Sequence, residues 1–265
     1  MKKAGIIGSI IALVLVIISI GGIVFGYYKK ANEEIVNPIV TMEVENYGTI
    51  KIELYPEKAP NTVANFVTLA NNGFYNGTTF HRVVKDFMVQ GGGFTSQVVT
   101  DSETGETKND SVAKGVKLKD LGIEGKNAEE AYCIKGEMLE NGYKNNTLKH
   151  EEGVISMARA DYTNYSASLA EESYNSATSQ FFIVTQKTEY LDGKYTAFGK
   201  VIEGYDIVEK IENVEVEKTE QEGDEESTPV EAIVIKSVTV DTKGVEYSKP
   251  ETLEPFDLLS WYYGM

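Results

Sequence analysis

The stretch that decides the fold runs Phe80-His81-Arg82-Val83-Val84-Lys85-Asp86-Phe87-Met88-Val89-Gln90-Gly91-Gly92-Gly93-Phe94. Its short apolar runs at residues 83–84 and 87–89 indicate short strands. The three glycines that follow fit a bulge or a turn. Arg82 lies among the strand residues, where a charged group must either face solvent or serve a site. Arg82 is therefore the first candidate functional residue.

Apolar runs elsewhere in the chain predict a mainly β fold. Residues 39–45 and 49–54 form two expected strands around Asn46-Tyr47-Gly48, and the later strand alternates apolar and polar residues, which indicates one buried face. Several short strands with few helices predict a closed or nearly closed antiparallel sheet. The remaining runs lie at residues 154–157, 181–185, 197–201 and 233–240.

Two helices are expected beside these strands. The first opens at Pro60 and Asn61, carries apolar residues at the i, i+3, i+4, i+7 spacing, and ends at Gly73. The second covers residues 205–211 after Gly204 and has one apolar face. Its expected role is to plug one end of the barrel.

Charge and composition argue against nucleic acid as a partner and against a His/Cys metal cluster. The chain of 265 residues has 25 Lys and Arg against 41 Asp and Glu, a formal charge of −16, which repels phosphate backbones and argues against nucleic acid. Its single cysteine, Cys133, cannot form an internal disulfide, and with His81 and His150 as the two histidines the sequence offers no metal cluster. Stability has to come from packing.

The amino terminus has the pattern of a membrane anchor. Residues 4–28 are 25 consecutive residues without a charge. As a helix with about 1.5 Å per residue they would be roughly 37 Å long, enough to cross a hydrocarbon layer of ~30 Å with some tilt. We therefore expect a transmembrane helix within residues 1–30 and a linker over residues 31–38.

A cleaved signal peptide is the alternative, because a basic start before an apolar stretch also begins secretory signals. Cleavage would fall near residues 19–21, but apolar character resumes afterwards and ends in Tyr27 and Tyr28, which suit an interfacial anchor better. The positive-inside rule slightly favours a cytoplasmic amino terminus. The expected location is the cell membrane, single-pass, with the folded domain outside the cytoplasm. Cleavage would make the protein secreted.

Two polar segments and a tail complete the expected organisation. Residues 95–131 are rich in Thr, Asp, Glu, Gly and Lys without sustained periodicity, and they are predicted to be a long surface insertion. Residues 215–231 are predicted to be an acidic loop. Residues 241–265 are left as a C-terminal tail.

Further sequence blocks follow the first stretch. With them the sequence resembles the cyclophilins over residues 39–240. The resemblance implies a closed eight-stranded antiparallel barrel capped by two helices. It also implies peptidyl-prolyl cis-trans isomerase activity on proline-containing polypeptides, without a cofactor. The blocks are Gly153-Val154-Ile155-Ser156-Met157-Ala158-Arg159, Ser179-Gln180-Phe181-Phe182-Ile183-Val184-Thr185, Leu191-Asp192-Gly193-Lys194 and Phe198-Gly199-Lys200-Val201.

The resemblance also implies which residues form the site. Arg82, Phe87 and Gln90 take the catalytic roles, and Gln90 is positioned to hold Arg82. Main-chain groups at Arg159 hold the substrate backbone, so its side chain is free to differ from the asparagine common in the family. Tyr195 stands where well-known members carry histidine. The implied substrate-binding residues are Met88, Ala158, Arg159, Ala160, Gln180, Phe182, Tyr190, Leu191 and Tyr195.

The chemistry asked of Arg82 is to ease rotation about an X-Pro bond, whose barrier comes from the partial double-bond character of the C–N bond. A cation beside the prolyl nitrogen favours its lone pair remaining on nitrogen, which stabilises the twisted state selectively. Arginine suits this role because its guanidinium stays ionised and presents donors in a fixed plane.

Two other functions compete with this interpretation. A cyclophilin-like binding or chaperone module with little turnover would keep the barrel and engage a partner through the insertion or the acidic loop. A Ser-His-acid hydrolase would need a histidine beside a nucleophile, and neither Ser156 nor Ser179 has the context of a nucleophile elbow. His81 falls on the strand face opposite Arg82 by alternation, so it is predicted to be a structural hydrogen-bonding residue.

Overall fold

The structure is a computed structural model that describes residues 36–100, 105, 107–218 and 225–265, together with residues 16 and 19–22. The chain divides into two compact units, Met1–Val36 and Asn37–Met265. No helix among the described residues is long and apolar enough to cross a membrane. The predicted anchor at residues 1–30 lies almost entirely outside the described residues, so it stays a prediction.

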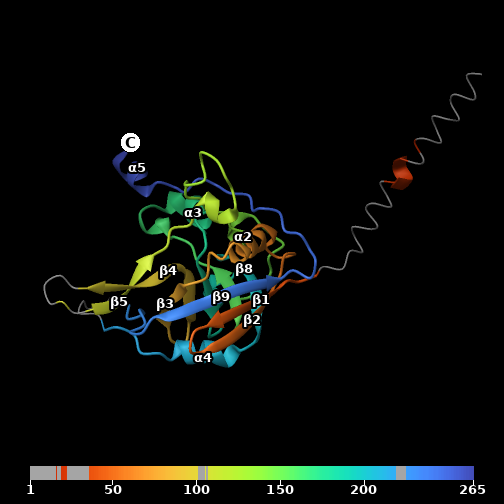
Figure 1. The fold of residues 1–265 in the computed structure, drawn as a ribbon. Coiled ribbons are helices and arrows are strands. Elements are labelled where there is room, and N and C mark those ends of the chain that lie inside the picture. The colour runs from red at the N-terminus through yellow and green to blue at the C-terminus, as the bar shows by residue number, and fades with distance from the viewer. Residues whose placement is uncertain (1–15, 17–18, 23–35, 101–104, 106, 219–224) are drawn as a thin grey trace, which may run out of the picture. The chain divides into compact units, whose positions relative to one another are not determined.

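One antiparallel sheet organises the larger unit. Its strands are β1 (Ile39–Val44), β2 (Gly48–Leu54), β3 (Thr78–Val84), β4 (Met88–Thr100), β5 (Thr107–Ala113), β6 (Val154–Met157), β7 (Phe181–Val184), β8 (Ala197–Glu203) and β9 (Ile233–Asp241). They follow the order β3-β9-β1-β2-β8-β6-β7-β4-β5, and β3 pairs with β4 as well (Figure 1). That pairing closes the predicted eight-stranded barrel, and β5 continues the sheet outside it.

The β1–β2 hairpin shows why these residues form strands. The predicted alternation is confirmed, because Ile50, Ile52 and Leu54 are fully buried while the residues between them are partly exposed. The turn requires positive φ, which Asn46 supplies at 64° and Gly48 at 129°. Asparagine and glycine tolerate this backbone better than other residues, so the sequence fixes the turn where the structure has it.

Strands β6 and β7 are apolar without interruption because both of their faces are buried. All four residues of each strand are buried. Phe181 and Ile183 point into the barrel core, whereas Phe182 and Val184 join a smaller apolar cluster on the outer face together with Met88. The outer cluster provides an apolar surface that is separate from the core of the barrel.

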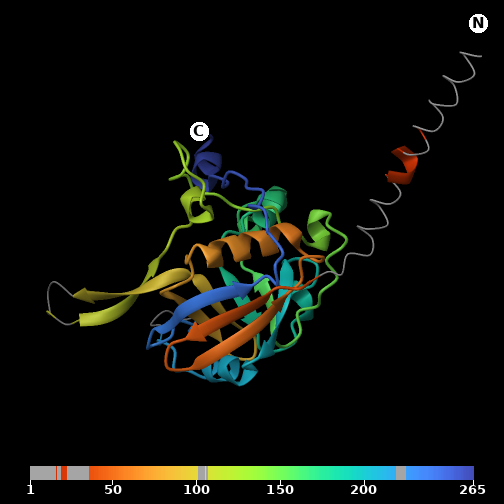
Figure 2. The same ribbon diagram turned by 45° about the vertical axis from the view of Figure 1, so that its right-hand side comes forward.

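Two helices cover opposite ends of the barrel, as predicted (Figures 1 and 2). Helix α2 (Pro60–Asn71) begins with proline in its first turn, and helix α4 (Tyr205–Glu212) follows a left-handed glycine. Phe66 of α2 anchors the core, with its ring centroid 4.8 to 5.8 Å from those of Tyr75, Phe181 and Phe198. The short helices α3 (Ala170–Tyr174) and α5 (Leu258–Tyr263) were not predicted.

The predicted insertion at residues 95–131 is more regular than its sequence suggests. Strand β4 continues through Thr100, and β5 returns beside it in register from Phe94↔Ala113 to Thr100↔Thr107. Both views show the pair as a ribbon that extends away from the barrel (Figures 1 and 2). A two-stranded ribbon outside the barrel buries no complete face, so it needs no alternation of apolar residues. The lack of apolar periodicity in this part of the insertion is therefore compatible with regular β structure.

The acidic loop and the C-terminal tail both attach to the barrel unit. Val216 and Pro229 form an isolated bridge between the two described arms of the loop. In the tail, Leu253 pairs with Cys133 through two backbone hydrogen bonds of 2.8 and 3.0 Å. The tail therefore packs on the unit for part of its length.

Glu137 is a buried carboxylate that caps helix α2. It is 6% exposed and accepts hydrogen bonds from Asn61 N–H at 3.0 Å, Thr62 N–H at 2.8 Å and the Thr62 hydroxyl at 2.7 Å. The first N–H groups of a helix have no partner within the helix. A negative charge at this end is also attracted by the positive end of the helix dipole. Glu137 satisfies these donors from a loop that is 75 residues away in sequence.

We expect Glu137→Ala to lower the free energy of unfolding by about 2–4 kcal/mol, because it leaves several donors unsatisfied. Chemical denaturation of the purified chain measures the change. Glu140→Ala is the matched control, since Glu140 is exposed and accepts one hydrogen bond, from the hydroxyl of Tyr174. Equal effects of the two variants would show that capping by Glu137 is not important.

His81 falls at a register shift in the pairing of β3 with β4, between Phe80 and Arg82, where the predicted simple alternation is interrupted. Its ring packs on Phe94 with centroids 4.2 Å apart, and its Nδ1 atom is buried without a hydrogen-bond partner among the described residues. Burial lowers the pKa of His81 to about 4, which keeps the ring neutral at physiological pH. Hydrogen bonding with the Thr79 backbone and the Gln180 side chain raises the pKa of the ring, against this larger effect of burial.

The depressed pKa of His81 predicts a loss of stability in acid. The unfolded chain takes up a proton near pH 6.5, while the folded chain does not until about pH 4, so lowering the pH favours unfolding. Between pH 7.5 and pH 5 we expect the wild type to lose about 2 kcal/mol more than His81→Gln. Urea denaturation at both pH values measures this difference, and parallel losses would contradict it.

Candidate active site

The β3–β4 hairpin places the catalytic candidates side by side. In its register Arg82 lies opposite Gln90 and Val84 opposite Met88, so Arg82, Gln90 and Met88 share one face. The turn between the strands puts Asp86 in a left-handed conformation, with φ at 58°. Its N–H donates to the Glu212 carboxylate of helix α4 at 2.8 Å, which ties the turn to the rest of the fold.

The neighbouring strands extend this face. Gln90 of β4 pairs with Phe182 of β7, and Phe182 pairs with Ser156 of β6. The outer apolar cluster therefore lies directly beside Arg82 and Gln90. Leu191 and Tyr195, which follow β7 in a short loop, pack on the same cluster.

A cavity of about 150 Å³ opens on this face of the barrel. Nine of the predicted site residues line this cavity, whereas Ala160, Gln180 and Tyr190 do not. Gln180 accepts a hydrogen bond from Gln90 at 2.8 Å, and Tyr190 is 64% exposed with its ring 6.0 Å from that of Phe87. The cavity is lined by Arg82, Phe87, Met88, Gln90, Ala158, Arg159, Phe182, Leu191 and Tyr195.

The Arg82 guanidinium has contacts on two sides. On the pocket side, Nη1 lies 3.4 Å from Gln90 Oε1 and 3.6 Å from Met88 Sδ. On the other side, Nε and Nη2 donate to the two carboxylate oxygens of Glu225 at 2.6 and 2.8 Å. Hydrogen bonds from Arg82 hold the pKa of Glu225 below its usual range, so this carboxylate is charged at neutral pH. Sequence reasoning missed Glu225, which is 143 residues away in the chain.

Arg159 lies at the pocket with its side chain between two aromatic rings. Its guanidinium carbon is 4.4 Å from the ring centroid of Tyr195 and 5.1 Å from that of Tyr174. Nη1 donates to the Ala160 carbonyl and Nε to the Lys194 carbonyl, at 3.0 and 3.1 Å. Within the described residues, the backbone N–H and carbonyl of Arg159 have no hydrogen-bond partner. These backbone groups are therefore available to a bound peptide.

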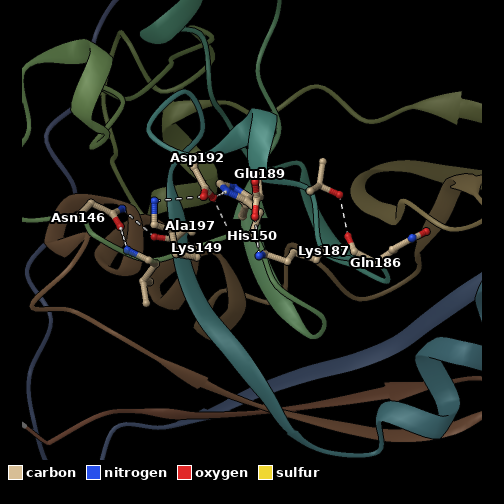
Figure 3. Close-up of polar contacts among 11 residues, drawn as sticks. Asn146, Lys149, His150, Gln186, Lys187, Glu189, Asp192 and Ala197 are labelled. Atoms are coloured by element: carbon tan, nitrogen blue, oxygen red, sulfur yellow. Dashed lines mark hydrogen bonds and ion pairs between the residues drawn. The ribbon is translucent and has the colours of Figure 1, made fainter.

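His150 is buried behind the pocket, where its ring contacts that of Phe182. Its Nδ1 lies 3.1 Å from Asp192 Oδ1, its Nε2 lies 3.1 Å from Ser156 Oγ, and its ring stacks on Phe182 with centroids 6.1 Å apart. Figure 3 shows His150 and Asp192 together, with the Lys149 ammonium 3.2 Å from the same carboxylate. Asp192 also fixes the His150 backbone N–H, at 2.8 Å. This network connects the loop before β6 to the loop that carries Leu191.

The contacts of Ser156, His150 and Asp192 have the order of a hydrolase triad, which the sequence did not predict. Their environment excludes that chemistry, because Ser156 is fully buried in β6 and His150 is 1% exposed. A nucleophile must reach the substrate carbonyl, and this hydroxyl reaches only the histidine. Burial also lowers the pKa of His150, although Asp192 opposes the shift. The three residues are structural.

The chemistry of the pocket comes from side chains and backbone groups of the described residues. No group of three or more His, Cys, Asp or Glu side chains among these residues could hold a metal ion. The pocket combines one apolar surface, from Phe182, Met88 and Leu191, with the guanidinium groups of Arg82 and Arg159 and with free backbone groups. Such a site can bind a peptide and act on it electrostatically.

Comparisons with known proteins agree with this geometry. Residues 39–240 match the family model of the cyclophilin type peptidyl-prolyl cis-trans isomerases/CLD. A peptidyl-prolyl cis-trans isomerase of Acinetobacter baylyi is 32% identical over 85% of this chain and 94% of its own length. Peptidyl-prolyl cis-trans isomerase B of Escherichia coli is 33% identical over 74% of this chain and 95% of its own length.

The structural comparison gives the same result. A crystal structure of a Cryptosporidium parvum cyclophilin type peptidyl-prolyl cis-trans isomerase, determined in the presence of the dipeptide Ala-Pro, aligns with a TM-score of 0.51 at 26% identity. The alignment covers 77% of this chain and 98% of that one. With the closed barrel, the pocket beside Arg82 and the family match in agreement, this chain belongs to the cyclophilin-type peptidyl-prolyl cis-trans isomerases.

Proposed function

We propose that this isomerase accelerates X-Pro rotation in exported or surface polypeptides, and that Arg82 stabilises the twisted prolyl amide. The single observation that supports the mechanism is the position of the guanidinium at the edge of an apolar cavity large enough for a proline ring. Phe182, Met88 and Leu191 would bind the ring by apolar contact, which favours proline over polar residues.

Each part of the site has a separate task in this proposal. The free backbone groups of Arg159 would hold the peptide on one side of the proline, so that rotation moves only the other side. Nη1 of Arg82 would donate to the prolyl nitrogen as its lone pair localises. The planar ground-state amide has little basicity at nitrogen, so this interaction strengthens in the transition state and lowers the barrier of about 18–20 kcal/mol.

We also propose that residues 1–30 hold the enzyme in the cell membrane, with the barrel unit outside the cytoplasm. The support is the uncharged length of residues 4–28 and the Tyr27-Tyr28 pair at its end. In this arrangement residues 31–38 link the anchor to the isomerase domain. Clients would then be proteins that fold after export, where uncatalysed isomerisation takes tens to hundreds of seconds.

A binding or chaperone module with little turnover is the second candidate. One observation favours it: Glu225 already occupies two donors of Arg82 and offsets its charge. An isomerase assay with proline peptides on the full-length chain separates the two functions. Turnover well above the uncatalysed rate supports the enzyme, whereas peptide binding without turnover supports the module.

Arg82→Ala should lower kcat/KM by about 10²-fold or more while the fold stays intact, because Arg82 acts mainly on the transition state. Protease-coupled or NMR exchange assays measure the rate, and thermal unfolding checks the fold. Lys85→Ala is the control, since it removes the same charge from an exposed position in the adjacent turn and should keep its activity. Full activity in a folded Arg82→Ala chain would refute the mechanism.

The full-length chain should remain in the membrane fraction through high-salt and alkaline washes, because an apolar span of about 20 residues binds far more strongly than surface charge. Replacing Leu13 and Val16 together by arginine should release it, since charged groups are costly at the centre of a bilayer. Immunoblotting of the fractions measures both. Release of the unmodified chain as a shortened soluble species would establish cleavage instead.

A further inference from the structure

The described arms of the acidic loop, residues 215–218 and 225–231, lie beside the strand that carries Arg82. The two arms pair, with Glu217 N–H donating to the Thr228 carbonyl at 2.7 Å. The returning arm also binds β3, because the N–H of Val83 donates to the carbonyl of Ser227 at 2.7 Å. These backbone bonds position the arm next to the active face of the barrel, one residue from Arg82.

Glu225 reaches Arg82 from this arm with both carboxylate oxygens. The bonds from Nε and Nη2, at 2.6 and 2.8 Å, make the carboxylate and the guanidinium meet edge to edge. Bidentate pairs of this kind are strong and well oriented. Nη1 remains on the pocket side, next to Gln90 and Met88. One edge of the guanidinium is thus bound to the loop, and one nitrogen faces the pocket.

A carboxylate in this place weakens the electric field of Arg82 in the cavity. Arg82 lines the cavity, whereas Glu225 lies behind it and does not. Coulomb energy falls as the inverse of distance, so a carboxylate that lies farther from the cavity than the guanidinium cancels part, and not all, of the effect of the positive charge. The stabilisation of a localised lone pair should decrease accordingly.

The same ion pair orients the guanidinium, which on its own would favour catalysis. Other contacts already provide orientation, however. Nη1 meets Gln90 and Met88, and the guanidinium carbon lies 5.9 Å from the ring centroid of Phe87. Orientation therefore persists without Glu225, whereas the field that Glu225 cancels is regained only when its charge is removed. The loss of field outweighs the gain in order.

We propose that Glu225, acting through Arg82, attenuates catalysis, so that this arm of the acidic loop keeps the isomerase below the rate its pocket could reach. This inference rests on the proposed role of Arg82 in the isomerase. The side chains of Arg82 and Glu225 are 32% and 49% exposed, so dissolved salt reaches the ion pair and weakens it. Activity should therefore increase with ionic strength.

The test compares Glu225→Gln with Glu226→Gln in the full-length chain. The control makes the same change of charge one position away, at a carboxylate that pairs with Lys218 at 3.7 Å instead of Arg82. We expect Glu225→Gln to raise kcat/KM about 3- to 10-fold at low salt, mainly through kcat, because the part of the Arg82 field that the carboxylate cancels is restored. The control should stay within about 1.5-fold of the wild type.

Salt dependence gives a readout that a merely structural role would not change. From about 20 to 300 mM NaCl, kcat/KM of the wild type and of Glu226→Gln should rise about 2- to 4-fold as the ion pair is screened. Glu225→Gln should change by less than about 1.5-fold, because it has no ion pair to screen. In an Arg82→Ala background, Glu225→Gln should have no effect, since Glu225 acts through Arg82.

Three results would overturn the proposal. The first is an unchanged or lower kcat/KM in Glu225→Gln. The second is an equal salt dependence of kcat/KM in the wild type and in Glu225→Gln. The third is a rise in kcat/KM on adding Glu225→Gln to Arg82→Ala that is as large as the rise in the wild type. If the wild type is active and any of these occurs, only this proposal fails. If neither the wild type nor Glu225→Gln isomerises proline peptides, the proposed function fails with it. Activity that is present only in Glu225→Gln would support the attenuation.

Discussion

The pairing of β3 with β4 is the interaction on which the rest of the structure depends. It closes the barrel, and the same register sets Arg82 across from Gln90. Because side chains alternate along a strand, a slip of one residue would turn the Arg82 guanidinium into the barrel core, where a lone charge is very costly. The apolar residues of the core therefore enforce the geometry of the active face. Stability and catalysis share one constraint here.

Much of this could be predicted from the sequence because it depends on local patterns. Alternation in residues 49–54 gave the strand and its buried face, and the spacing of apolar residues after Pro60 gave helix α2. The pocket residues came from ordered sequence blocks and not from physical chemistry. Phe182 is the clearest case, because its neighbour Phe181 has the same residue type yet belongs to the barrel core. Only the assignment of strand faces separates them.

The features that could not be predicted all depend on contacts between distant or solvated segments. Glu225 is one of many acidic residues in its loop, and nothing local distinguishes the one that meets Arg82. Glu137 caps a helix from another loop, for which short-range capping rules have no signal. The β4–β5 ribbon is stabilised by backbone pairing outside the closed barrel, so its residues carry no apolar period. Apolar patterns in a sequence indicate which faces are buried. These three features depend instead on polar contacts and backbone pairing, which leave no apolar pattern.

The position of β9 has a consequence for synthesis of the chain. β9 is the last strand to leave the ribosome, yet it lies between β1 and β3, which are among the first. Until β9 arrives, β1 and β3 each expose the backbone edge that pairs with β9 in the folded protein, and the barrel cannot close. Contacts between such distant segments slow folding. The isomerase domain must therefore emerge almost completely before the barrel can close, so its folding takes place mainly after its synthesis.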